Sequence, residues 1–254
     1  LKMMASKHLF MVTTTLLTGM VFTSQVGATI ALDRTRIIFN GADKSVSLSI
    51  SNQNKELPYL AQGWLENEQG EKIETPLIVL PPIQRIEPGN KSQVKVQSLP
   101  DIAQLPQDRE SVFYFNLREI PPRSDKPNVL QIALQTRIKL FYRPKSIYAT
   151  QTDLSNPWQE KITLTKQGES YVVHNPTPYY ITIVDGLTDL KGKSLEGFTP
   201  IMVAPRGQEK LNLTVSTLGA SPVLSYINDY GGRPRLKFSC DSRECKVIET
   251  DQGN

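Results

Sequence analysis

Alternation of apolar and polar residues at every second position is the feature that most restricts the fold of this chain. In the stretch SVSLSIS, residues 45–51, Val46, Leu48 and Ile50 share one side of an extended strand and serines take the other. Similar runs are separated by clusters of Pro, Gly and Asn. These further runs are residues 93–96, 112–117, 129–142, 161–164, 171–174, 180–184 and 211–215. With 18 prolines to interrupt helices, the sequence predicts many short β-strands.

The N-terminal segment has the features of a secretory signal. Lys2 and Lys7 precede an apolar stretch at residues 9–22, and the small residues Val-Gly-Ala follow at 26–28. A membrane anchor is the alternative, but threonines interrupt the stretch, which falls short of the roughly 20 apolar residues that a spanning helix needs. We therefore expect a signal peptide at residues 1–28, cleaved after Ala28.

Length and strand pattern together predict two domains. Removing 28 of the 254 residues leaves 226, more than one typical domain of about 100–150 residues. Many short strands with turns between them favour immunoglobulin-like β-sandwiches over an α/β fold, and 226 residues would make one unusually large barrel. The segment Arg143-Pro144-Lys145 ends a long run and precedes the polar stretch 149–156. We expect an all-β chain with domains at residues 29–148 and 149–254.

Charge and cysteine content restrict the chemistry. The formal charge of +4 falls to +2 without the signal, which carries two lysines and no acid, and this is too small to favour nucleic acid or a membrane surface. Cys240 and Cys245 are the only cysteines, and in an exported chain they predict a disulfide, with a metal pair or a redox pair as alternatives. A zinc site needs further ligands, and His174 is the one histidine after residue 28. We expect no cofactor.

The run LPQDRESVFYFNLREIP, residues 105–121, joins an acid-base cluster to a strand. In this order it resembles the signature of the periplasmic pilus chaperones, the PapD-like family. Further segments resemble the same family: LDRTR at 32–36, PPIQR at 81–85, IKLFYRP at 138–144, NPTPY at 175–179 and YINDYGG at 226–232. The resemblance covers nearly the whole chain after residue 28. It implies two immunoglobulin-like domains with a cleft between them.

The resemblance also implies a function. Pilus subunits of this system are immunoglobulin-like sandwiches that lack their last strand and expose a hydrophobic groove. A chaperone of this family stabilises and caps the subunit by donating a strand to that groove, a form of strand addition. It then delivers the subunit to the outer-membrane usher. The implied partners are pilins, the adhesin and the usher, in the periplasm, without nucleic acid or nucleotide.

The run at residues 129–142 is the candidate donor strand. Its apolar residues of one parity are Leu130, Ile132, Leu134, Ile138 and Leu140. Alternation alone leaves open whether this row faces the domain's own core or a partner. We expect the last two to face the core. The resemblance assigns Leu130, Ile132 and Leu134 to the subunit groove, which requires an exposed edge.

The resemblance assigns Arg36 and Lys139 to the cleft, where they bind the C-terminal carboxylate of the subunit. Two cations on one carboxylate give charge-assisted hydrogen bonds, which a partly desolvated cleft screens less than an open surface does. The alternative for each cation is a solvated surface charge. The expected consequence is an anchor that fixes the register of the subunit against the donor strand.

Three charged residues are implied to join the two domains. In the family, residues at the positions of Glu110, Arg143 and Asp229 form a salt-bridge cluster, and we expect it to orient the domains rather than add net stability. Cys240 and Cys245 match a disulfide of the P-pilus type. The short stretch 116–128 resembles the branch that serves rod-like pili.

Two other classes of protein are alternatives to a chaperone. An enzyme needs a nucleophile with a base or a metal site, and neither GxSxG nor HExxH is present, although carboxylate pairs keep a glycosidase open. We expect that this chain is not an enzyme. A pilus subunit would carry an N-terminal donor extension and one incomplete sandwich, whereas the motif at 32–36 lies almost at the start of the expected mature chain and two domains are predicted.

Overall fold

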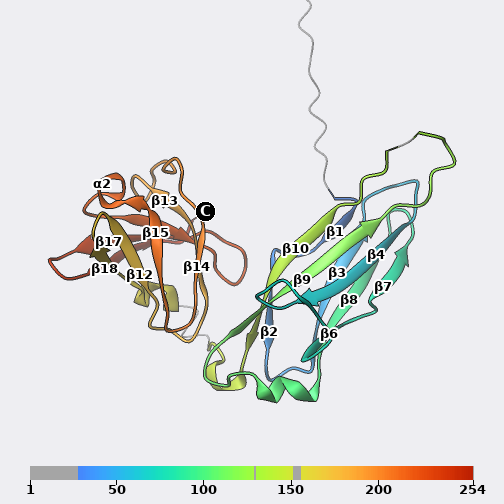
Figure 1. Cartoon of the computed structure of the whole chain (residues 1–254), viewed down its shortest axis with the longest axis horizontal. Helices are drawn as coiled ribbons and strands as arrows, with labels where there is room; N and C mark the ends of the chain where they lie inside the picture. The colour runs from blue at the N-terminus through green and yellow to red at the C-terminus, as the bar shows by residue number, and fades with distance from the viewer. Residues whose placement is uncertain (1–27, 129, 151–155, 254) are drawn as a thin grey trace, which may run out of the picture.

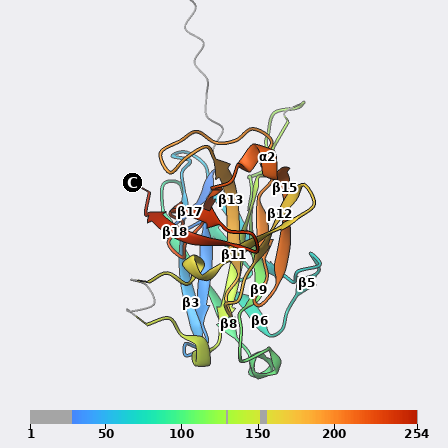
Figure 2. The ribbon, with the colours of Figure 1, turned by 90° about the vertical axis from the view of Figure 1, so that its left-hand side faces the viewer.

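The computed structural model describes residues 28–128, 130–150 and 156–253. Apart from Ala28, the predicted signal peptide lies outside the described residues. The chain forms two β-domains, each with its own hydrophobic core, which lie side by side in Figure 1. Figure 2 looks from the side of the second domain, whose strands lie in front of the first. The predicted all-β, two-domain fold is confirmed.

Helical structure among the described residues is brief. It consists of α2 (Val215–Leu218) and three 3₁₀ turns, at Pro100–Gln104, Lys145–Ile147 and Trp158–Lys161. In the described part of the chain, no helix has the length and apolar character to cross a membrane.

The first domain is a sandwich of two sheets. The first sheet has the order β1 (Ile30–Leu32), β3 (Ser45–Asn52), β8 (Lys91–Ser98) and β6 (Leu77–Leu80). The second sheet has the order β2 (Arg36–Asn40), β10 (Gln135–Arg143), β9 (Ser111–Ile120), β4 (Tyr59–Glu66) and β5 (Lys72–Ile73), and β7 (Ile83–Ile86) also pairs with β4. Both sheets appear in Figure 1.

The alternating pattern fills the space between these sheets. Leu48 and Ile50 of β3 are fully buried, and they meet Phe115 and Leu140 of the second sheet in one core. Burying a side chain of this size contributes about 1.5–3 kcal/mol. The serines between them stay on the outer face, as the alternation predicts.

The N-terminal strand changes sheets, and this leaves part of β10 unpaired. β1 pairs with β3 in the first sheet, whereas β2 pairs with β10, parallel to it, in the second. That pairing starts at Lys139, opposite Arg36. In the part of the chain that the structure describes, residues 135–138 therefore pair only with β9, and their other edge is free.

The predicted strand at residues 129–142 is too long at its N-terminal end. The strand starts at Gln135, and residues 130–134 are not part of any strand. β9 ends at Ile120 and is followed by Pro121 and Pro122, which have no backbone donor, so no ladder continues beside this segment beyond the bond from the Glu119 amide to the Leu134 oxygen. Residue 129 lies outside the described residues.

The second domain has one continuous strand order. It is β14 (Ile201–Val203), β13 (Ile181–Leu187), β16 (Val223–Tyr226), β17 (Arg235–Cys240), β18 (Cys245–Asp251), β11 (Thr163–Gln167), β12 (Ser170–His174) and β15 (Gln208–Thr214). The strands predicted at 171–174, 180–184 and 211–215 lie within a few residues of β12, β13 and β15. Tyr171 and Phe238 are among the fully buried residues of its core.

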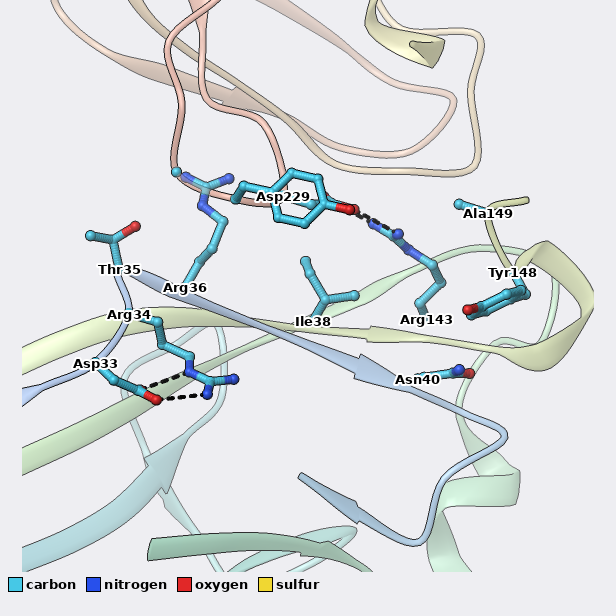
Figure 3. A pocket seen from close by; sticks show the side chains of 12 residues that line it. Asp33, Arg34, Thr35, Arg36, Ile38, Asn40, Arg143, Tyr148, Ala149 and Asp229 are labelled. Atoms are coloured by element: carbon cyan, nitrogen blue, oxygen red, sulfur yellow. Dashed lines mark hydrogen bonds and ion pairs between the residues drawn. The ribbon is translucent and has the colours of Figure 1, made fainter. Parts of the chain in front are cut away.

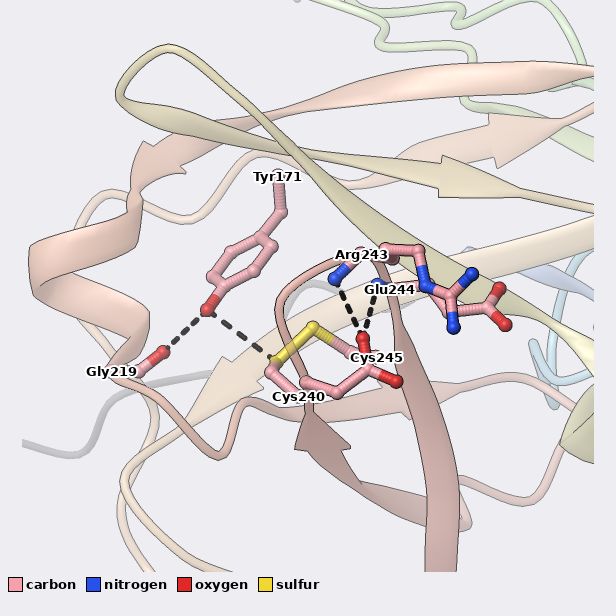
Figure 4. The surroundings of a disulfide bond; sticks show 7 residues. Tyr171, Gly219, Cys240, Arg243, Glu244 and Cys245 are labelled. Atoms are coloured by element: carbon pink, nitrogen blue, oxygen red, sulfur yellow. Dashed lines mark hydrogen bonds between the residues drawn. A yellow bond between two sulfur atoms is a disulfide. The ribbon is translucent and has the colours of Figure 1, made fainter.

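The predicted disulfide between Cys240 and Cys245 is present (Figure 4). It joins the end of β17 to the start of β18, and it closes a short turn. Within that turn, the Asp241 carboxylate accepts hydrogen bonds from the amides of Arg243 and Glu244 at 2.7 and 2.9 Å. The covalent link therefore stabilises one hairpin of the second domain.

Candidate functional site

An open cleft of about 620 Å³ lies between the two domains. One wall is the start of the first domain, including Arg36 and Ile38 of β2, and the opposite wall is the second-domain segment Asp229-Tyr230-Gly231. Figure 3 shows Arg36 and Arg143 extending from the first domain toward that segment. The predicted cleft is therefore present, and Arg36 lies in it.

Arg36 has donor capacity that the protein does not use. Its guanidinium donates one hydrogen bond to the backbone oxygen of Ile227, at 3.3 Å. Its Nε is buried and has no hydrogen-bond partner among the described residues. Burial lowers the pKa of Arg36, against the nearby carboxylates of Asp229 and Glu110, and the group stays charged. An unpaired buried donor costs free energy, so an acceptor that reaches it would be bound favourably.

Lys139 lies beside Arg36. The two residues are direct partners in the parallel pairing of β2 and β10, so both side chains point to the same face of the sheet. Lys139 Nζ donates to Thr182 Oγ1 of the second domain at 3.3 Å. Burial and the charge of Arg36 lower the pKa of Lys139 to about 8. In the described part of the chain, no acid forms an ion pair with either cation.

Glu110, Arg143 and Asp229 come together as one ion cluster across the domain interface. Arg143 contacts Glu110 Oε1 at 2.7 Å and Asp229 Oδ2 at 2.8 Å, and the side chains of Arg143 and Glu110 are 6% and 2% exposed. Burial raises the pKa of the Glu110 carboxyl to about 7, although the Arg143 charge and the Tyr180 amide act in the opposite direction. The cluster links the end of β10 to the second domain.

Neighbours that sequence reasoning missed complete this interface. The Arg143 guanidinium carbon lies 5.0 and 4.9 Å from the ring centres of Trp158 and Tyr179, which stack on each other. The amide of Tyr180 donates to Glu110 Oε2, and the amide of Glu110 donates to the Pro178 oxygen, at 2.8 and 2.9 Å. The NPTPY motif at 175–179 thus carries an interdomain contact, and the tandem aromatic residues Tyr179 and Tyr180 were the available signal.

The candidate donor side chains lie on the surface. Leu130 is 84% exposed and Ile132 is 63% exposed, whereas Leu134 is partly buried. Leu140 is fully buried and Ile138 packs against the core, so the core assignment of these two is confirmed. Exposed apolar side chains that continue the free edge of β10 indicate a surface for a protein partner.

Known proteins share this architecture and sequence. A family described as "Pili and flagellar-assembly chaperone, PapD N-terminal domain" matches residues 29–148, and "Pili assembly chaperone PapD, C-terminal domain" matches residues 157–238. The chain is 54% identical over 226 residues to "Chaperone protein PapD" of Escherichia coli, covering 88% of this chain and 92% of that protein. It is 51% identical over 222 residues to "Probable fimbrial chaperone YfcS" of Escherichia coli (strain K12), covering 87% of each.

Solved structures agree. The crystal structure of the periplasmic chaperone SfaE, 28% identical, superposes with a TM-score of 0.64 and covers 88% of this chain and 98% of its own. That of the YadV chaperone, 32% identical, gives a TM-score of 0.62 over 81% of this chain and 96% of its own. Matching both domains in sequence and in fold, this chain belongs to the PapD-like family of pilus assembly chaperones.

Proposed function

We propose that this chaperone binds pilus subunits by adding the edge of β10 and the segment before it to the open groove of the subunit. The free edge of residues 135–138 carries this proposal, because a paired edge could not accept another strand. Leu130, Ile132 and Leu134 are the proposed donor side chains. They share one parity, so an extended segment places all three in one groove.

The position of β2 explains where the subunit strand ends. β2 occupies the same edge of β10 from Lys139 onward, so a strand added beside residues 130–138 lies in line with β2 and stops before it. At that point it meets Arg36 and Lys139. Two cations favour a terminal carboxylate, and a C-terminus at this end means that the added strand runs parallel to β10. The anchor and the free edge therefore specify one direction and one register.

The working units in this proposal are the domains at 29–148 and 149–254, held by Glu110, Arg143 and Asp229. The signal at residues 1–28, cleaved after Ala28, would deliver the chain to the periplasm, where the disulfide can form. In this proposal the role of the chaperone is binding rather than catalysis. A subunit is released to the outer-membrane usher when another strand replaces the donated one.

Co-expression with pilins in the periplasm tests the function. We expect a soluble complex of one chaperone with one subunit to co-purify. Failure of every pilin and adhesin of the cognate system to co-purify would contradict the proposal. Assembly of the purified chain into fibres would identify a subunit instead.

Subunit affinity is expected to fall as the pH rises through about 8. Below that pH, Lys139 of the free chaperone is protonated; above it, binding a carboxylate requires proton uptake, which costs up to about tenfold in affinity per pH unit. Calorimetric titrations across this range measure the effect. Lys139→Arg keeps its charge and should bind with a flat pH profile. An equal pH dependence in Lys139→Arg would assign the effect to another group.

Ile132→Asp is expected to lower subunit affinity at least about 100-fold, because it places a charge in an apolar groove. Ile132 is exposed in the free chaperone, so the free energy of unfolding should change by less than about 0.5 kcal/mol. Ala133→Asp is the matched control, since it adds the same charge at the next, exposed position of opposite parity. Equal losses in both variants, measured by binding titration, would contradict the assigned parity.

A further inference from the structure

We propose that Glu119 is a positioning residue that keeps the edge of β10 open for the subunit strand. The inference rests on the proposed function of that edge. Glu119 lies near the end of β9 and is 4% exposed. Neither the ion cluster nor the carboxylate anchor includes it.

The Glu119 carboxylate holds a strand of the first sheet and the segment that leads into β10 of the second. Oε2 accepts a hydrogen bond from the amide of Ile30, the first residue of β1, at 2.9 Å. Oε1 accepts one from the amide of Leu134, the last residue before β10, at 3.4 Å, and the Glu119 amide donates to the Leu134 oxygen at 3.0 Å. One side chain thus fixes the start of the N-terminal strand and the base of the donor segment.

Packing alone does not explain a carboxylate at this place. Along β9, Phe113, Phe115 and Leu117 face the core, and the strand period puts Glu119 on the same side, between the two sheets. A buried polar group needs hydrogen-bond partners, and the partners of the Glu119 side chain are these two amides, since no cation pairs with it in the described part of the chain. An apolar residue could also fill the space between the sheets, but only a hydrogen-bond acceptor can bind the amides of both Ile30 and Leu134.

The N-terminal strand is the nearest competitor for the donor edge. In the register that pairs Arg36 with Lys139, a straight continuation of β2 would place residues 30–35 opposite residues 133–138. The donor edge would then be filled by the chaperone's own chain. Instead, β1 crosses to the first sheet, where Ile30 pairs with Asn52. The hydrogen bond from Ile30 to Glu119 secures that crossing.

The open edge is also held in a fixed shape. The backbone bond from Glu119 to Leu134 sets the alternation of the β9–β10 ladder, so the amides of Gln135 and Arg137 point away from β9. The side chains of these two residues bind back to the sheet, Gln135 to Asn116 at 2.9 Å and Arg137 to Glu66 at 2.8 Å. The two free amides can therefore donate hydrogen bonds to an incoming strand. Their exchange rates measure whether a strand has bound there.

Glu119→Leu tests the inference in the full chaperone, with residue-resolved amide exchange and the rate of subunit capture as readouts. Released from Glu119, the N-terminal strand should compete for β10, so exchange at Gln135 and Arg137 should slow and capture should slow about tenfold, equivalent to 1.4 kcal/mol. Glu119→Gln, which retains one acceptor oxygen, should lie between wild type and Glu119→Leu. Unchanged capture and unchanged or faster exchange in both variants would overturn the role of Glu119.

Leu77→Ala is the matched control for lost stability. Leu77 is fully buried in the same core and lies on β6, at the edge of the first sheet opposite β1 and away from the donor segment. This substitution should speed exchange at the hydrogen-bonded amides of the domain and leave exchange at the free amides of Gln135 and Arg137 fast, whereas Glu119→Leu should slow it there. A wild-type chaperone that captures no subunit would refute the proposed function, whereas normal capture by wild type and Glu119→Leu alike would refute only this inference.

Discussion

Replacing Lys139 with alanine is expected to abolish recovery of the chaperone–subunit complex while the chaperone stays folded, and Arg36→Ala should do the same. In the proposed function, each substitution removes a charge-assisted hydrogen bond to the subunit carboxylate, of about 1.5–3 kcal/mol. The larger consequence is loss of register, because the anchor sets which subunit residue meets which donor side chain. In the free chaperone neither cation forms an ion pair among the described residues, so little stability is lost.

Co-purification from the periplasm measures this effect, with circular dichroism to establish that the variants are folded. Lys145→Ala is the matched control, since it removes the same charge from an exposed residue of the 3₁₀ turn Lys145–Ile147. It should recover subunit like wild type. Normal recovery by both Lys139→Ala and Arg36→Ala would refute the anchor.

Arg143→Ala is expected to lower the free energy of unfolding by about 3–5 kcal/mol, because it leaves the Glu110 carboxylate buried without its cation. Removing Arg143 also removes the group that lowers the pKa of Glu110, so in the variant this carboxyl takes up a proton at a higher pH. The decrease in the free energy of unfolding should therefore be larger at pH 8 than at pH 5. Urea unfolding at the two pH values measures both effects.

Two variants separate the buried cluster from ordinary surface charge. Adding Glu110→Gln to Arg143→Ala removes the unpaired charge and should restore part of the stability. Arg85→Ala breaks an exposed pair with Glu87, side chains 61% and 53% exposed, and should change stability by less than about 1 kcal/mol. A loss below about 1 kcal/mol in Arg143→Ala would contradict a structural role for the cluster.

Alternation predicted the strands well wherever both faces of a strand have a defined environment. Leu48 and Ile50 face the core as their period requires. The prediction of a strand failed at residues 130–134. Apolar alternation shows that a segment can form a strand, but not that a neighbouring strand is there to pair with it. In the proposed function, their partner strand belongs to another protein, and in the free chaperone they lie outside the sheet.

The site depended on long-range pairing that sequence alone does not give. Arg36 and Lys139 are far apart in the chain, and only the parallel register of β2 and β10 brings them together. They could be named from the family resemblance, but not from charge or spacing. Glu119 could have been found, since it is an acid at an inward position that follows Phe113, Phe115 and Leu117. Its partner Ile30 became visible only when β1 was placed in the opposite sheet.

Amide exchange of residues 130–138 in the chaperone, free and in complex with a subunit, tests strand donation most directly. The proposal predicts fast exchange at Gln135, Arg137 and the preceding donor segment in the free protein, and strong protection along the whole segment in the complex. Lys139→Ala should remove that protection under the same conditions. Unchanged exchange at residues 130–138 in a stable complex would contradict strand donation by β10.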